Sequence, residues 1–351
     1  MTRPSAMNTV NKDSEMKTAI LSLTEGAGAL AADLAARLPE ATVIGGGGSV
    51  AQVLAENWQE GYDAFICIMA AGIVVRSIAP LLKDKASDPC VVVVDEKGGF
   101  AVSLLSGHLG GGNDLARQVA DITDGQAVIT TASDALGLTA LDLWARANGL
   151  IVEDKAALTR VTAKLVNQGM VTIYFDVQTE RLPSHFVRVE RPDQADIIVS
   201  ARQMVVGEGA VVMRPAQLVF GIGCNRNTPV EEISQAVTDL CRDHDLSPLA
   251  IRNLASIDLK NDEVGLLEYG RQNKLTIEFF GKDELNTVPG VSSSAAVMAA
   301  TGAVGVAEPA ALLSASTNKL LIRKQKWKNV TLAVAEIPYM LSAPAPVISN
   351  I

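Results

Sequence analysis

A regular alternation of short apolar runs and amphipathic stretches between Lys17 and Asp134 constrains the fold more than any other feature of the chain. The apolar runs have the length of buried strands, and the stretches between them repeat apolar residues at helical spacing. Such alternation predicts βα units around a parallel sheet. The expected strands are 18–23, 41–44, 64–69, 91–94, 101–105 and 127–131, and the expected helices are 27–38, 50–58, 73–82 and 113–123.

The middle of the chain follows another pattern, which Pro183, Pro192 and Pro215 interrupt. Its expected elements are helices 138–148 and 155–168, strand 171–175 and short strands near Val187 and Ile198. The α/β alternation then returns. Its expected strands are 218–222, 250–255, 276–279, 320–324 and 330–336, and its expected helices are 229–243 and 263–272 and two near 293–301 and 309–314.

These patterns predict a multidomain α/β protein, with two α/β lobes of mainly parallel sheet joined by a smaller central α/β or α+β unit. The expected parts are a disordered extension over 1–16, an N-terminal domain over 17–134, a central domain over 135–213, a linker over 214–217, a C-terminal domain over 218–338 and a tail over 339–351.

Composition excludes several classes of function. The formal net charge of −9 and the pI of about 5.0 make nucleic acid and anionic membranes poor partners. The longest apolar run, Ala64 to Val75, is shorter than the roughly 20 residues of a membrane span, and the polar start lacks the pattern of a signal peptide. We therefore expect a cytoplasmic protein. The four cysteines show no C-x-x-C spacing, which favours buried thiols over a zinc site or disulfides.

A glycine-rich turn at Ser106–Asp114 follows a predicted strand and contains His108, one of three histidines. Asn113 is the expected N-cap of the next helix. Ligands of open α/β sheets bind at such strand ends, where free amides meet anionic or carbonyl oxygens. The alternative is a tight turn whose glycines only supply positive φ and whose histidine caps a neighbouring group.

A similar loop, Gly221–Asn227, precedes a predicted capping box at Thr228-Pro229-Val230-Glu231. Arg226 and the loop amides can receive a carboxylate, or the glycines can serve turn geometry alone. The charged residues between Ala255 and Glu263 are either part of a site or a solvated helix start.

Several long runs resemble the cobalt-precorrin-5A hydrolases of anaerobic cobalamin biosynthesis. The resemblance extends over about Lys17 to Glu336, and two departures from the family pattern are Asn225-Arg226-Asn227 in place of Arg-Gly and Gly112 in place of alanine. The matching runs are Ala71–Lys85, Asp88–Glu96, Ser103–Asn113, Val128–Asp134, Gly221–Cys224, Leu254–Glu263, Gly265–Leu267 and Gly305–Leu312.

The resemblance implies a cobalt-bearing corrinoid substrate whose δ-lactone is opened by water, with loss of acetaldehyde, to give cobalt-precorrin-5B. Lactone hydrolysis needs a base for water and donors for the oxyanion. His108 is the candidate base, and the amides around Gly107 and Gly110–Gly112 are candidate donors. Asp134 either orients His108, acts as an acid or caps the next helix. Cobalt arrives with the substrate, so we expect no cofactor and no protein-bound metal.

Arginine and lysine pair with carboxylates, of which a corrinoid carries many. A basic cluster at Lys319, Arg323, Lys324, Lys326 and Lys328 either guides a polyanion or forms a solvated hairpin face. His185 and His244 have no motif neighbours. The expected substrate-binding residues are Arg76, Lys85, Ser106, Gly107, Gly110, Gly111, Asn113, Thr130, Thr131, Gly223, Cys224, Arg226, Asp258 and Lys260.

Two other classes of function compete with hydrolysis. A non-catalytic protein that binds or carries a corrinoid intermediate is consistent with the lack of a nucleophile–base–acid triad. Nucleotide binding is disfavoured, because the chain has neither a Walker lysine pattern nor G-x-G-x-x-G with a downstream acid. The expected partner is the corrinoid, and contacts with neighbouring pathway enzymes and a homodimer are compatible with the sequence.

Overall fold

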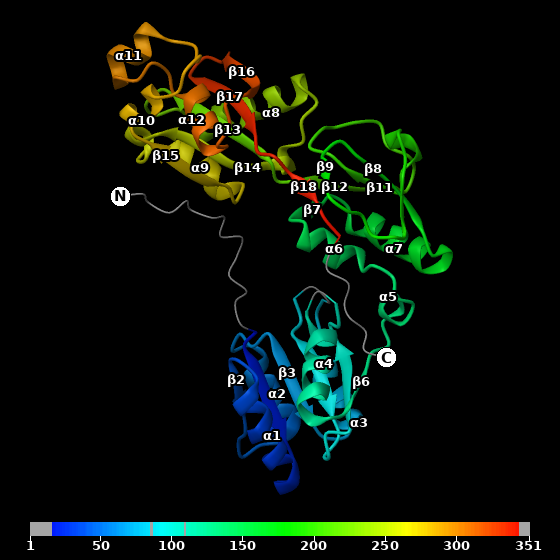
Figure 1. The fold of residues 1–351 in the computed structure, drawn as a ribbon. Coiled ribbons are helices and arrows are strands. Elements are labelled where there is room, and N and C mark those ends of the chain that lie inside the picture. Colours follow the sequence, from blue (N-terminus) through cyan, green and yellow to red (C-terminus); the bar gives the residue numbers. More distant parts are fainter. Residues whose placement is uncertain (1–15, 85–86, 109, 344–351) are drawn as a thin grey trace, which may run out of the picture. The chain divides into compact units, whose positions relative to one another are not determined.

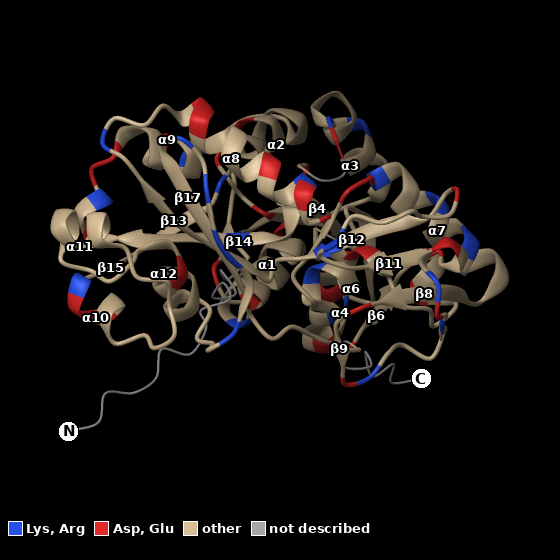
Figure 2. Ribbon diagram, turned by 90° about the horizontal axis from the view of Figure 1, so that it is seen from above, with Lys and Arg blue, Asp and Glu red and all other residues tan. Residues whose placement is uncertain are grey.

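The structure, a computed structural model, describes residues 16–84, 87–108 and 110–343 (Figure 1). The chain forms two compact units, residues 1–143 and 144–351. All of the expected N-terminal extension except Met16 lies outside the described residues, as do Lys85 and the end of the expected tail. Acidic and basic residues are interspersed along the ribbon of each unit (Figure 2).

The first unit contains a six-stranded sheet in the order β2-β1-β3-β4-β5-β6. Every neighbouring pair is parallel except β4 and β5, which are antiparallel. The strands are β1 (Thr18–Ser22), β2 (Ala41–Val43), β3 (Ala64–Ile68), β4 (Cys90–Val94), β5 (Phe100–Leu105) and β6 (Gln126–Val128). The helices are α1 (Glu25–Arg37), α2 (Val50–Trp58), α3 (Ala71–Ile78), the 3-10 helix η1 (Ala79–Leu81), α4 (Gly112–Thr123), α5 (Ala132–Ala135) and the start of α6 (Leu141–Ala147).

The apolar runs of β3 and β4 are continuous because both faces of the sheet are covered. Ile66 and Val92 pack with residues of α1 and α4 in one core cluster. Phe65 and Val91 point the other way and pack with residues of α2 and α3 in a second cluster. Alternate residues therefore serve opposite cores, as expected for strands buried between two helical layers.

The reversal of the chain between β4 and β5 decides where the loops of this unit lie. The Asp95 carboxylate accepts hydrogen bonds from the N–H groups of Lys97 and Phe100, and Gly98 adopts a φ of +73°. This tight turn sends β5 back beside β4, and β6 runs parallel to β5. The carboxyl ends of β5 and β6 therefore lie at the edge where β1, β3 and β4 begin.

The second unit contains two five-stranded sheets. The first has the order β10-β8-β11-β12-β7, with only the β12–β7 pair antiparallel. Its elements are β7 (Leu150–Val152), α7 (Lys155–Gln168), β8 (Val171–Phe175), β10 (Phe186–Arg188), the 3-10 helix η2 (Pro192–Gln194), β11 (Ile197–Val199) and β12 (Val211–Pro215).

The other sheet has the order β15-β14-β13-β17-β16, with β13, β14 and β15 parallel and β17 antiparallel to both β13 and β16. Among the described residues, no helix is both long and apolar enough to cross a bilayer. The elements are β13 (Leu218–Cys224), α8 (Val230–Asp243), η3 (Pro248–Ala250), β14 (Ile251–Ile257), η4 (Asp258–Lys260), α9 (Val264–Gln272), β15 (Thr276–Phe280), α10 (Lys282–Asn286), α11 (Ala295–Thr301), α12 (Ala307–Ser314), β16 (Leu320–Lys326) and β17 (Val330–Glu336).

The predicted α/β class is confirmed, with three large sheets whose strands are mostly parallel. Three local expectations differ from the structure. Arg214 and Pro215, expected in a linker, form the end of β12, where Pro215 pairs with Leu150 at the sheet edge. In the expected tail, β18 (Met340–Leu341) pairs with β9 (Gln178–Thr179). The capping box of α8 does not form, because the Thr228 hydroxyl donates to the Asn225 carbonyl and Pro229 takes the N-cap position.

Arg214 ties segments of the second unit together from a buried position. Its Nε lies 2.6 Å from Glu153 Oε1, and its Nη1 donates to the carbonyl oxygens of Ser200 and Arg202. Because the side chain is only 5% exposed, water competes little with its hydrogen-bonding partners. The residue expected in a linker is thus a buried, hydrogen-bonded cation.

Arg214→Met should lower the free energy of unfolding of the second unit by about 1.5–3 kcal/mol, since the glutamate and the carbonyls lose a charged donor. Urea unfolding followed by tryptophan fluorescence reports this change, because Trp144 is buried in the same unit. The exposed Arg181→Met is the matched control and should stay within about 0.5 kcal/mol of the wild type. Equal stability of both variants would contradict the role given to Arg214.

Candidate active site

The loops that follow β5 and β6 meet at one edge of the first sheet, because these strands are parallel neighbours. The first loop leads into α4 through a compact turn. In it, the N–H groups of Gly111, Gly112 and Asn113 donate to the carbonyl oxygens of His108, Ser106 and Gly107. Ser106 and Gly111 have φ values of +52° and +81°. The turn is therefore a closed, hydrogen-bonded structure.

Asn113 connects this turn to the loop after β6. The expectation that Asn113 caps α4 is wrong, since the N-cap is Gly111 and Asn113 lies within the first turn of the helix. Its Nδ2 donates to Thr131 Oγ1 and to Asp134 Oδ2, both at 3.1 Å. A residue four positions further along α4, Arg117, lies on the same helix face and also reaches Asp134.

His108 lies between two carboxylates. Its Nε2 is 2.9 Å from Asp134 Oδ2 and 3.1 Å from Ser133 Oγ. Its Nδ1 is 3.8 Å from Asp142 Oδ1, on the first turn of α6. The ring is 19% exposed, so it is shielded but within reach of solvent. Asp134 itself lies inside α5, whose N-cap is Thr131.

Asp134 is held as an anion. Burial acts to raise its pKa, but hydrogen bonds from Arg117 and His108 outweigh burial and hold the pKa below the ordinary value. Arg117 Nη2 lies 2.6 Å from Asp134 Oδ1, while the other carboxylate oxygen accepts from Asn113. At neutral pH the carboxylate is ionised and can only accept hydrogen bonds.

Two glycines of the turn are required by close packing. A Cβ on Gly107 would collide with Asn113 Oδ1 and lie 3.2 Å from Ser103 Oγ. A Cβ on Gly110 would lie 2.6 Å from the Cβ and the carbonyl oxygen of Ser106. Among the described residues, the N–H groups of Gly107 and Gly110 have no hydrogen-bond acceptor, whereas those of Gly111 and Gly112 are engaged. Of the candidate oxyanion donors, the N–H groups of Gly107 and Gly110 are therefore the two that can still donate to a substrate.

Sequence reasoning missed Arg117, Ser133 and Asp142. Helical spacing from Asn113 could have indicated Arg117, because residues four apart share a face. Ser133 lies in a run quoted for the family resemblance, next to Asp134. No local signal links Asp142 to His108, since the contact depends on where α6 begins.

Other predicted residues of the first unit have other surroundings. Ser106 Oγ donates to the Asp88 carbonyl, and Thr130 is exposed beside Thr131. Arg76 lies on α3, which starts at the opposite edge of the sheet, and its guanidinium donates to the Gly72 carbonyl. The described contacts therefore do not bring Arg76 to His108.

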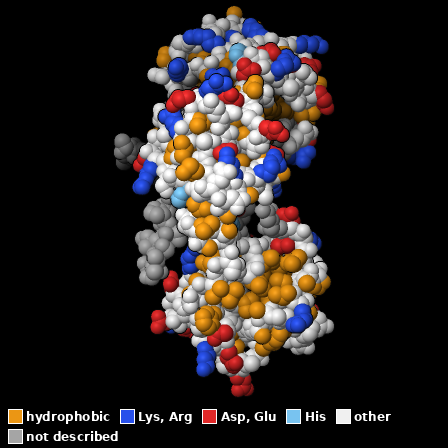
Figure 3. Space-filling model, turned by 90° about the vertical axis from the view of Figure 1, so that its right-hand side faces the viewer, with side chains coloured by type: hydrophobic (Ala, Val, Ile, Leu, Met, Phe, Trp, Pro, Cys, Tyr) orange, Lys and Arg blue, Asp and Glu red, His pale blue; other side chains and the backbone are white. Residues whose placement is uncertain are grey.

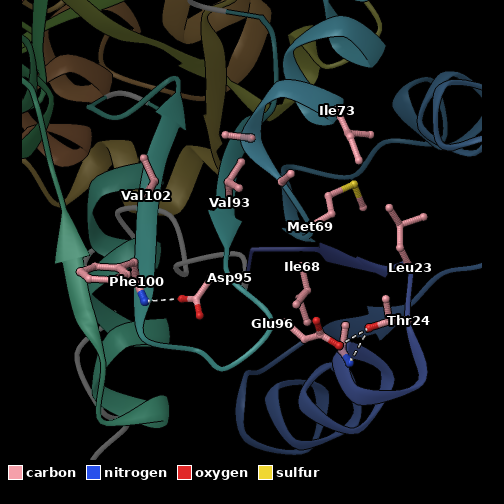
Figure 4. A pocket seen from close by; sticks show the side chains of 13 residues that line it. Leu23, Thr24, Ile68, Met69, Ile73, Val93, Asp95, Glu96, Phe100 and Val102 are labelled. Atoms are coloured by element: carbon pink, nitrogen blue, oxygen red, sulfur yellow. Dashed lines mark hydrogen bonds between the residues drawn. The ribbon is translucent and has the colours of Figure 1, made fainter.

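A cavity of about 470 Å³ lies at that opposite edge, outside the carboxyl ends of β1, β3 and β4 (Figure 4). Its lining is mostly apolar and includes the partly exposed Leu23, Ile73 and Phe100. Hydrophobic side chains also gather on the face of the first unit that Figure 3 presents. The carboxylates that line the cavity are Asp95, which accepts from the Phe100 N–H, and Glu96, which accepts from the Thr24 hydroxyl. None of the predicted site residues lines this cavity.

In the second unit, the ends of the parallel strands β13 and β14 bring the predicted charged residues together. Arg226 pairs with Asp262 and donates to the Leu259 carbonyl, and Lys260 lies 3.3 Å from the buried Glu263. These cations are already paired with carboxylates. Asp258 starts η4 beside them.

Gly223 and Cys224 precede this charged loop. A Cβ on Gly223 would lie 2.7 Å from Thr331 Oγ1 on β17, so the glycine serves strand packing. Burial raises the pKa of the Cys224 thiol to about 11. The thiol therefore stays protonated at neutral pH and is a poor nucleophile.

The fold and the site define an α/β protein with a histidine held by an ionised carboxylate, an arrangement of the kind that hydrolases use for acid/base chemistry. Three family models match consecutive parts of the chain: Cobalamin synthesis G N-terminal over 52–134, Cobalamin biosynthesis central region over 139–215 and Cobalamin synthesis G C-terminus over 218–335. The first model includes His108 and Asp134.

Curated relatives agree with these matches. A cobalt-precorrin-5A hydrolase of Priestia megaterium is 35% identical, over 83% of this chain and 83% of that protein. One of Salmonella typhimurium is 34% identical, over 93% of this chain and 99% of that protein. A solved cobalamin biosynthesis protein G homologue from Sulfolobus solfataricus covers 92% of this chain and 97% of its own at 22% identity, with a TM-score of 0.38. The chain belongs to the cobalt-precorrin-5A hydrolase family.

Gly107→Ala should destabilise the first unit by about 1–3 kcal/mol, because the new methyl group must displace Asn113 or the strand beneath it. The displacement should also loosen the Asn113 contacts with Asp134. Thermal unfolding measures the loss. Gly47→Ala is the matched control, since a Cβ there meets no atom within 4 Å, and it should leave the Tm unchanged. A fully stable Gly107→Ala protein would show that the turn has room for a side chain.

Proposed function

We infer that this chain is a cobalt-precorrin-5A hydrolase of anaerobic cobalamin biosynthesis. Water opens the δ-lactone of the corrinoid substrate, acetaldehyde leaves, and cobalt-precorrin-5B is the product. Family membership over most of the chain supports the reaction, and the observation that carries the chemistry is the His108–Asp134 pair at 2.9 Å. The hydrolytic step needs a positioned base, and a histidine can accept a proton near neutral pH.

In this proposal, His108 removes a proton from the attacking water. Asp134 fixes the ring and stabilises the imidazolium that forms, because Arg117 keeps the carboxylate ionised. The amides of Gly107 and Gly110 are the proposed donors to the oxyanion of the lactone carbonyl. Their glycines allow the turn to pack closely against Asn113 and Ser106, which fixes the direction of the two amides.

Lactone opening frees a hydroxyethyl group for the second step. Loss of the hydroxyl proton and cleavage of the carbon–carbon bond give acetaldehyde, and the electron pair of that bond passes into the macrocycle, which takes up a proton. His108, neutral again once lactone opening is complete, can accept the hydroxyl proton and deliver it to the macrocycle. We propose that cobalt arrives with the substrate and that the protein contributes no cofactor.

The corrinoid carboxylates require cations, and we propose Arg226, Lys260 and the basic residues of β16 for this role. Arg226 and Lys260 would have to exchange Asp262 and Glu263 for substrate. The cavity bounded by Asp95 and Glu96 is a poor site for the polyanion, because its polar groups are carboxylates of the same sign.

His108→Gln should lower kcat for anaerobic acetaldehyde release from cobalt-precorrin-5A by about 10²–10⁴-fold, because glutamine keeps a similar size but accepts no proton. His185→Gln is the matched control and should retain wild-type turnover. Unchanged turnover of His108→Gln would remove this residue from the mechanism. Tight corrinoid binding by the wild type without any acetaldehyde would instead indicate a carrier protein.

A further inference from the structure

The proton positions around His108 follow from its neighbours. An ionised carboxylate has no proton to donate, so the 2.9 Å contact with Asp134 requires the proton to be on Nε2. The Ser133 hydroxyl, 3.1 Å from the same nitrogen, then faces an N–H rather than a lone pair. His108 therefore does not activate Ser133 as a nucleophile in this arrangement.

The lone pair of neutral His108 is consequently on Nδ1, the nitrogen that faces Asp142. The distance of 3.8 Å from Nδ1 to Asp142 Oδ1 is longer than a direct hydrogen bond. Two acceptors that face each other repel unless a donor lies between them. Asp142 Oδ1 is fixed in this direction by a 2.9 Å hydrogen bond from the Leu143 N–H.

We propose that Nδ1 of His108 and Oδ1 of Asp142 together bind the attacking water, with Asp142 as a further catalytic residue. One water can donate a proton to each acceptor, since a span of 3.8 Å allows its oxygen to lie about 2.8 Å from both. The oxygen lone pairs then point away from both groups, toward the lactone carbonyl. This inference rests on the proposed function. It assigns Nδ1 of His108 as the nitrogen that takes the proton from water and Oδ1 of Asp142 as the second acceptor.

One O–H bond of the water breaks, its proton binds Nδ1, and the oxygen forms a bond to the lactone carbonyl carbon. The carbonyl electron pair moves to oxygen, and the tetrahedral adduct then expels the ring oxygen as an alcohol with the proton from Nδ1. Between the attack of water and the loss of the alcohol, His108 is an imidazolium with a carboxylate at each nitrogen. Asp142 stabilises this cation at Nδ1, the nitrogen that took the proton from water.

Nitrogen-15 NMR of the whole protein labelled at histidine tests the nitrogen assignment without substrate. Only three histidines contribute signals, and His108→Gln identifies the one of interest. Neutral His108 should carry its proton on Nε2 and a lone pair on Nδ1. A proton on Nδ1 in the neutral ring would overturn the proposal.

Acetaldehyde release tests Asp142. Asp142→Asn should lower kcat by roughly 100-fold with little change in KM, and Asp142→Glu, which keeps the charge, should recover part of the loss. Asp121→Asn, at an exposed position of α4, is the matched control. Wild-type kcat in Asp142→Asn, or equal losses in the Asn and Glu variants, would overturn the role of Asp142. If the wild type releases no acetaldehyde, the proposed function fails, while the NMR result still decides the nitrogen assignment.

Discussion

The ion pair between Arg117 and Asp134 is the interaction on which the candidate site depends. Arg117 holds one oxygen of the carboxylate at 2.6 Å, which leaves the other oxygen for His108 and Asn113. Burial acts to raise the pKa of Asp134, and the guanidinium is one of the groups that outweigh it. One cation on α4 therefore helps to keep Asp134 ionised and holds the carboxylate in place beside His108.

Chain direction explains why these groups meet at all. Because β5 runs back along β4, the loops after β5 and β6 lie at the edge where β1, β2, β3 and β4 begin. The carboxyl ends of β1, β3 and β4 instead form the apolar cavity at the opposite edge. A wholly parallel sheet would have placed His108 at the cavity edge and Asp134 with it.

Much of this organisation could be predicted from the sequence. Strands buried on both faces, such as β3 and β4, are visible as continuous apolar runs, and α2 has the predicted bounds because its apolar spacing is regular. Apolar periodicity does not report strand direction, so the reversal at β5 was not predicted. Pro215 predicts a linker, whereas in the structure it ends β12, where a proline beside β7 costs the sheet little.

The site was predictable where its residues are close in sequence or share a motif. The option that Asp134 orients His108 matches their 2.9 Å contact, whereas Asn113 was expected to cap a helix and instead bridges two loops. Asp142 could not be predicted, because its approach to His108 depends on how the chain between α5 and α6 folds. Likewise, only the structure shows that Arg226 and Lys260 are paired with carboxylates.

A double-mutant cycle on kcat/KM for acetaldehyde release tests most directly whether Arg117 acts through Asp134. The cycle compares Arg117→Gln, Asp134→Asn and the double variant with the wild type. If the two residues work as one unit, kcat/KM of the double variant should be no lower than that of the less active single variant. The coupling energy between the two substitutions should then be about 0.5–3 kcal/mol. Losses that simply multiply in the double variant would contradict the account.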